Sequence, residues 1–152
     1  MHTETIQVGR QRGVTLLELM IVVANVAMIS AFAFTSYTQY VVNTKRTAAT
    51  SALLQVADRQ QQFFMDNKTY AADLTNLGFS EHPQFIADDG RLVAAGDGDA
   101  VYLLTLANVA PTTYTAIAAP LGSQLKRDTK CGTMTLDQAG AKDALAGGDD
   151  CW

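Results

Sequence analysis

The chain has 152 residues, 48% of them hydrophobic, and 11 Lys and Arg against 15 Asp and Glu give a formal net charge of −4. This mild acidity argues against a general affinity for nucleic acid or anionic lipid, because both attract basic surfaces. The length allows one domain beyond an apolar N-terminal segment.

The most apolar part of the chain runs from Val14 to Phe34, 21 residues without Lys, Arg, Asp, Gly or Pro. A helix rising about 1.5 Å per residue crosses a hydrocarbon layer about 30 Å thick over this length. The apolar core of an ordinary secretory signal is shorter, roughly 7–15 residues. We therefore predict a transmembrane segment over residues 14–35.

One acid interrupts the apolar run, Glu18, at its fifth position. Insertion of a carboxylate costs roughly 2.5–3.5 kcal/mol near the bilayer centre and less near its edge. An acid kept at that depth needs a partner.

The helical pattern continues beyond the membrane run. Apolar residues recur at spacings of three and four as far as Phe64, and no Gly or Pro occurs between Val14 and Asn67. We predict one helix of about 50 residues, apolar all round in its first half and with one apolar stripe over residues 36–66. Its polar face, which includes Lys45, Arg46 and Gln60 to Gln62, is interpreted as solvated or facing another subunit.

Residues 67–100 break the helical period and are rich in turn residues, so we predict a long connecting loop with one short turn of helix from Asp73 to Gly78, ending in glycine. Its acids Asp88, Asp89, Asp97 and Asp99 are of the kind that bind Ca²⁺, but their spacing does not match the Ca²⁺-binding loop consensus. We expect solvated turns and no metal site.

Strand patterns dominate residues 101–137. Three segments, 101–106, 113–118 and 131–136, are rich in β-branched and aromatic residues or alternate in polarity. Three such strands in sequence predict an antiparallel sheet, and the apolar stripe of the long helix is available to cover one face of it. The expected fold class is α+β.

The two cysteines, Cys131 and Cys151, both lie far downstream of the membrane run. In a domain carried across a membrane, an even pair of this kind predicts a disulfide. The bond would close a loop over residues 131–151.

The one basic cluster consists of Lys126, Arg127 and Lys130, with Asp128 between them. Phosphate contacts need such groups, but the cluster is short and lacks interleaved aromatic residues. A solvated loop is the favoured interpretation, and DNA contact is the alternative.

Catalysis finds little support. Beyond residue 13 there is one histidine, His82, beside Pro83, and no serine, cysteine or paired-acid arrangement with a recognisable spacing. We expect no enzyme activity, catalytic residue or cofactor. Asn67-Lys68-Thr69 fits a glycosylation sequon, which is weak evidence alone.

The stretch Gly13-Val14-Thr15-Leu16-Leu17-Glu18-Leu19, preceded by Arg10 and Arg12, resembles the class III signal of type IV prepilins and pseudopilins. The resemblance implies a basic leader over residues 1–13 that prepilin peptidase removes after Gly13, and methylation of the new N-terminus at Val14. It also implies that Glu18 pairs with the N-terminal amine of a neighbouring subunit. Val14 replaces the usual Phe, and Thr35 replaces the Pro of many major pilins.

The tail, Cys131-Gly132-Thr133-Met134-Thr135-Leu136-Asp137 and a final Cys151-Trp152, is similar to that of PilE-type minor pilins. The resemblance implies the type IV pilin fold, with residues 36–152 forming a periplasmic or extracellular head. It further implies a single pass through the inner membrane before assembly and a place in a cell-surface pilus afterwards.

The implied function is that of a minor pilin, a structural subunit that acts in pilus assembly or priming and hence in motility, adhesion or DNA uptake. The implied partners are prepilin peptidase, other major and minor pilins, the inner-membrane assembly platform and membrane lipid, while nucleic acid is not an expected partner. A type II secretion pseudopilin and a DNA-binding competence pilin are the alternatives. An anchored periplasmic enzyme would need convergent polar residues that the sequence does not show.

Overall fold

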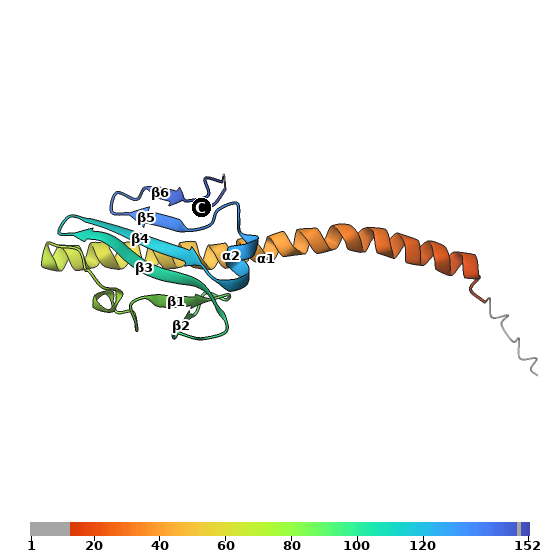
Figure 1. Ribbon diagram of the computed structural model, residues 1–152, viewed down its shortest axis with the longest axis horizontal. Coiled ribbons are helices and arrows are strands. Elements are labelled where there is room, and N and C mark those ends of the chain that lie inside the picture. The colour runs from red at the N-terminus through yellow and green to blue at the C-terminus, as the bar shows by residue number, and fades with distance from the viewer. Residues whose placement is uncertain (1–12, 149) are drawn as a thin grey trace, which may run out of the picture. The chain divides into compact units, whose positions relative to one another are not determined.

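The computed structural model describes residues 13–148 and 150–152, without the side chains of residues 32–35. Apart from Gly13, the expected leader lies outside the described residues, as does the side chain of Thr35. The chain divides into two compact units, one ending at Thr38 and the other beginning at Gln39. One helix, α1, contributes to both units (Figure 1).

Helix α1 (Leu16–Asn67) has 52 residues, so the prediction of one long helix is confirmed. Thr15 stands just before it, and its Oγ1 accepts the backbone N–H of Glu18 at 3.2 Å, as in a capping box. The helix stops where Lys68 turns to a left-handed conformation with φ of 59°. There the Lys68 N–H donates to the carbonyl of Phe64 at 2.9 Å, which satisfies one of the free carbonyls of the last turn.

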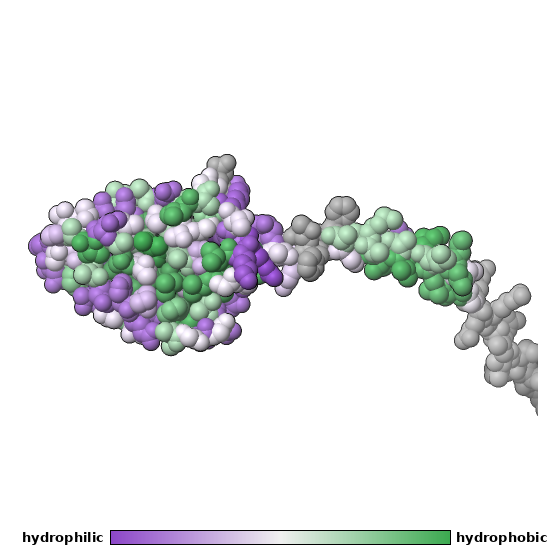
Figure 2. All heavy atoms as spheres, viewed as in Figure 1, coloured by the Kyte–Doolittle hydropathy of each residue, from purple (hydrophilic) through white to green (hydrophobic). Residues whose placement is uncertain are grey.

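The first unit contains the apolar part of α1, and its described side chains are exposed. Leu16, Leu17 and Ile29 are 76%, 69% and 70% exposed. On the face seen in Figure 2, hydrophobic residues cover much of this part of the helix. Among the described residues, α1 is the one helix long and apolar enough to cross a membrane, judged by length and composition alone.

The second unit contains a sheet of six antiparallel strands in the order β2-β1-β3-β4-β5-β6 (Figure 1). The other elements, in chain order, are η1 (Leu74–Leu77), β1 (Gln84–Ala87), β2 (Leu92–Val93), β3 (Ala100–Ala110), β4 (Thr113–Pro120), α2 (Gly122–Arg127), β5 (Met134–Asp137) and β6 (Lys142–Ala144).

The core of the second unit lies between the later part of α1 and one face of the sheet. From the helix, Leu53 and Val56 are fully buried, and they belong to one cluster with Leu104, Tyr114 and Met134 from the strands. Burying side chains of this size stabilises the fold by about 1.5–3 kcal/mol each. The predicted packing of the helix stripe on the sheet, and with it the α+β fold class, is confirmed.

The predicted turn of helix within residues 67–100 is confirmed as η1, which Asp73 caps at its start and Gly78 at its end. Four elements go beyond the predicted sheet and loop: β1 and β2 within residues 67–100, and α2 and β6. These elements are short, and β6 (Lys142–Ala144) has no strand-forming composition, so only its pairing with β5 makes it a strand. Tertiary pairing of this kind leaves no local periodic signal.

Candidate functional site

The predicted cleavage position, Gly13 and Val14, lies in non-helical backbone just before α1 begins at Leu16. Val14 is 65% exposed, and a Cβ built on Gly13 would meet no atom within 4 Å. The peptide between these residues is therefore accessible in this structure.

Glu18 lies in the first turn of α1 and is exposed. Its backbone N–H is bonded to Thr15, but within the described residues its carboxylate makes no hydrogen bond or ion pair. A carboxylate is favoured in the first turn, where the helix dipole is positive. Any specific partner for it must come from outside the described chain.

A disulfide joins Cys131 to Cys151 across a sequence separation of 20, as predicted. Both cysteines are buried, 0% and 5% exposed. Within the loop they close, the backbone of Gly148 lies against Lys130, because a Cβ at residue 148 would clash with the Lys130 carbonyl oxygen. The bond and this close approach fix the tail beside the start of the loop.

The side chain of Trp152 packs the tail against β6. The indole Nε1 of Trp152 donates to the carbonyl of Asp143 at 3.0 Å, and the Nζ of Lys142 lies 5.3 Å from the centre of the Trp152 ring. This contact ties the last described residues to β6.

The basic residues Lys126 and Arg127 occupy the last turn of α2, and Lys130 follows shortly after. All three side chains are exposed, and none forms an ion pair within the described residues. The structure therefore gathers the three predicted residues on the surface at one end of α2.

Asp128, the acid within this cluster, points away from the surface. It is 1% exposed, and its carboxylate accepts hydrogen bonds from the Arg46 guanidinium at 2.6 and 3.1 Å. Because Arg46 neutralises Asp128 inside the head, the acid does not offset the charge of its three basic neighbours at the surface.

A buried polar network extends from this ion pair. The Gln124 amide donates to the Tyr102 hydroxyl at 3.0 Å and to the Val42 carbonyl of α1 at 3.2 Å, and the Tyr102 hydroxyl donates to Asp128 at 3.2 Å. Burial raises the pKa of Tyr102 well above its usual range, which keeps the hydroxyl protonated. The network joins α2 to both α1 and β3.

Arg46 also reaches the tail, because its Nη1 donates to the carbonyl of Asp150 at 3.4 Å. The interpretation of Arg46 and Gln60 as part of a solvated face is wrong, since they are 7% and 0% exposed. Their positions in the sequence could have placed them inside. One stripe of the helix runs through Val42, Arg46, Leu53 and Gln60, because successive residues in this series are four or seven apart, about one or two helical turns. Buried polar residues on such a stripe need partners, and Arg46 and Gln60 have them.

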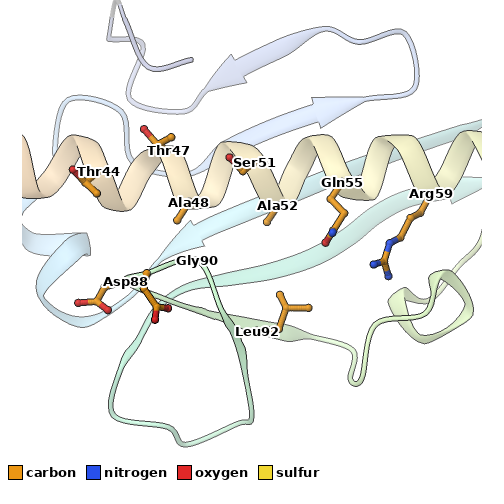
Figure 3. Close-up of a pocket in the computed structure, with 11 residues that line it drawn as sticks. Thr44, Thr47, Ala48, Ser51, Ala52, Gln55, Arg59, Asp88, Gly90 and Leu92 are labelled. Carbon is orange, nitrogen blue, oxygen red and sulfur yellow. The ribbon is translucent and has the colours of Figure 1, made fainter.

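A groove of about 680 Å³ lies between α1 and the β1–β2 turn (Figure 3). Asp89 on its rim is paired with Arg91, whose hydrogen bond lowers the pKa of the Asp89 carboxyl. Thr44 and Thr47 line it from α1, and their hydroxyls donate to carbonyls of their own helix. The residues that line the groove include hydroxyls and two carboxylates, and none of them is a His or Cys.

The acids considered for Ca²⁺ are engaged in turns. Asp97 accepts the backbone N–H of Asp99, and Asp88 lies 3.9 Å from the Nζ of Lys45. Among the described residues, no group of three or more His, Cys, Asp or Glu side chains is placed to hold a metal ion. His82 accepts the backbone N–H of Leu74 at 3.4 Å.

Comparison with known proteins relates the chain to type IV pilins. Residues 35–135 match the model of a family described as type IV minor pilin ComP, DNA uptake sequence receptor. The type IV major pilin protein PilA of Myxococcus xanthus is 32% identical over 90 residues, which are 59% of this chain and 40% of PilA, so the chain spans about two fifths of that relative. A solved type IV pilin from Shewanella oneidensis is 19% identical, with a TM-score of 0.47 over 70% of this chain and 92% of that one.

Proposed function

The chain belongs to the type IV minor pilin family whose model it matches, and from this membership we propose that it acts as a subunit of a type IV pilus that docks through Glu18. The observation that carries the proposal is the state of the first part of α1. Its apolar side chains are exposed all round, and its one acid has no partner within the described chain. Such a surface requires partners supplied by membrane or by other subunits.

In this proposal residues 14–35 cross the inner membrane once, and residues 36–152 form the head on the far side. Prepilin peptidase removes residues 1–13 between Gly13 and Val14, and the new N-terminal amine is methylated. The accessible, non-helical backbone at this peptide supports the cleavage, since a protease needs an extended substrate and a glycine lets its backbone approach closely.

The docking step follows from the cost of an isolated charge in an apolar medium. Beside the N-terminal ammonium of a neighbouring subunit, the Glu18 carboxylate regains the solvation that it loses in lipid. The favourable interaction therefore exists only between subunits and sets their register along an otherwise smooth apolar surface. The assembly platform in the inner membrane and other major or minor pilins are the partners that this step requires.

The test is to shear filaments from the cell surface and identify their subunits by mass spectrometry. We expect this chain in the filaments with Val14 as its methylated N-terminus, and Gly13→Leu should leave the uncut form in the membrane. A different N-terminus would contradict the processing step. Recovery only with a type II secretion system would assign the chain to the pseudopilins, which share the same docking chemistry.

A second function, DNA contact, is favoured by one specific observation. Lys126, Arg127 and Lys130 are exposed together while Asp128 is turned inward and neutralised. The matched family is described as a DNA uptake sequence receptor, which agrees with a phosphate-binding role for this surface. We propose that these three side chains contact the DNA backbone.

Binding of duplex DNA at several salt concentrations tests this role. Each phosphate contact contributes about 0.9 to the slope of log K against log salt, so Lys126→Ala with Lys130→Ala should reduce the slope by about 1.8. The matched control is Lys68→Ala, an exposed lysine whose Nζ donates to the Met65 carbonyl at the end of α1. An unchanged slope in the double variant, or an equal reduction in the control, would contradict the assignment.

A further inference from the structure

The apolar part of α1 contains a second strongly polar side chain, Asn25. It is exposed, and no hydrogen bond joins its amide to another group in the described part of the chain. Ser30 differs, because its Oγ donates to the Val26 carbonyl at 2.7 Å. Asn25 is thus an amide in the predicted membrane run that its own helix does not satisfy.

The predicted depth of Asn25 in the membrane decides which groups its amide can bond. Asn25 lies nine residues after Leu16, where α1 begins, which at 1.5 Å per residue places it about 14 Å along a helix that crosses a layer of about 30 Å. Near the middle of that layer no water is available to bond an amide, so a partner must be another protein group.

The position of Asn25 on the helix also matters. It follows Glu18 by seven residues, or two helical turns, so both side chains lie on one stripe. The opposite face is a shallow groove lined only by apolar residues: Leu16, Leu19, Met20, Val23, Ala24 and Ala27. The helix therefore has one polar stripe and one apolar face before any partner binds.

From these observations we propose that Asn25 forms a hydrogen bond with Asn25 of a second copy of this chain, and that it pairs the two membrane helices before the subunits enter a filament. An amide donates and accepts, so it is complementary to its own copy. Copies inserted in the same orientation place Asn25 at the same depth in both helices. The inference rests on the proposed membrane insertion of residues 14–35.

The stripe also predicts what the pair does to Glu18. In two parallel helices that cross at Asn25, the two Glu18 side chains lie at equal depth on the same side, where like carboxylates repel. Asn25 therefore holds the pair together while Glu18 opposes it. Docking of Glu18 to a neighbour's N-terminal amine then requires the pair to separate.

The test uses the full chain in vesicles of phosphatidylethanolamine and phosphatidylglycerol. Gly98, where a Cβ would meet no atom within 4 Å, is replaced by Cys to carry donor or acceptor dyes, since both native cysteines are in the disulfide. Energy transfer is then followed as protein is diluted into lipid. Asn25→Val should raise the dissociation constant roughly 3- to 20-fold, the range measured for such bonds between membrane helices.

Matched variants distinguish loss of the amide hydrogen bond from general effects of a substitution in the membrane helix. Asn25→Gln keeps an amide and should retain the transfer, and Ser30→Ala, which removes a hydroxyl already bonded in its own helix, should leave it unchanged. Glu18→Gln removes the opposed charges and should bind at least as tightly as the wild type. An intact disulfide in each variant shows that the head is folded.

Three results would overturn the inference: equal transfer in Asn25→Val and wild type, loss of transfer in Glu18→Gln, or transfer only when a different pilin is added. In each of these the chain still floats with the vesicles, so the proposed membrane anchor stands. If the chain does not float with the vesicles, the proposed anchor fails and the inference fails with it.

Discussion

The two parts of α1 differ in where their partners lie. After Gln39 the helix buries one stripe against its own sheet, with Leu53 fully buried and Arg46 paired to Asp128. Before Thr38 the described side chains are exposed; Leu19, for example, is 55% exposed. One continuous helix thus serves as a core element in one unit and as an unpartnered apolar surface in the other.

This difference shows what each part of the helix contributes. The later part stabilises the head through burial, hydrogen bonds and an ion pair within the chain. In the earlier part, the described side chains before Thr38 are exposed. Substitutions there should therefore leave the stability of the head unchanged and alter membrane and subunit contacts. The predictions below test that separation.

The largest effect on stability should come from breaking the buried ion pair between α1 and α2. Arg46→Met leaves Asp128 charged and unpaired inside the head, which costs about 3–5 kcal/mol in the free energy of unfolding. Urea unfolding of the full chain in detergent measures the loss. The control is Lys45→Met, whose partner Asp88 is 56% exposed and lies 3.9 Å away, and which should cost less than about 1 kcal/mol.

A double variant at the Arg46–Asp128 ion pair gives a second test by urea unfolding. Arg46→Met with Asp128→Leu removes both charges, so the double variant should recover much of the lost stability. A double variant as unstable as Arg46→Met would show that the loss comes from packing of the arginine side chain and not from an unpaired acid.

The same substitution on the two parts of the helix gives a direct comparison. Leu53→Ala opens a cavity in the core and should lower the free energy of unfolding of the head by about 2–5 kcal/mol. Leu19→Ala changes an exposed side chain in the other unit and should leave that value unchanged. Similar losses in the two variants would contradict the separation.

The disulfide should have an effect of similar or smaller size. Closing about 20 residues stabilises the head by roughly 3 kcal/mol on the chain-entropy model, with native-state strain subtracting from this. Cys131→Ser should lose this amount, and adding Cys151→Ser should cost little more, because one bond is lost in both cases. Two free thiols in wild-type protein that is alkylated on extraction from cells would contradict the assignment.

The fold could be predicted where a local pattern reports it. The spacing of apolar residues gave the long helix, and the two long strands showed strand-forming composition. By contrast, β2 has two residues and β6 has no strand-forming composition, and both depend on pairing with distant segments. No local pattern records such pairing.

The site residues also divide into those with a local signal in the sequence and those whose role depends on contacts with distant residues. Glu18 and the cysteines were singled out because an acid in an apolar run and an even cysteine pair are unusual in themselves; the structure confirms the disulfide, and the docking role of Glu18 stays a prediction. Arg46 was assigned to a solvated face because its charge was weighed and its position on the buried stripe was not. The inward direction of Asp128, which decides the surface charge of the basic cluster, depends on Arg46, 82 residues away along the chain.

The central claim is that Glu18 acts between subunits, and the Glu18→Ala variant tests it most directly. The change keeps the backbone bond to Thr15 and removes an insertion penalty of up to about 3 kcal/mol, so membrane level and cleavage after Gly13 should be normal. The measurement is the amount of the chain in sheared pili relative to the amount in the membrane. We expect this ratio to fall well below that of the wild type, with loss of pilus-dependent motility. An unchanged ratio with unchanged piliation would show that Glu18 has no docking role in this subunit.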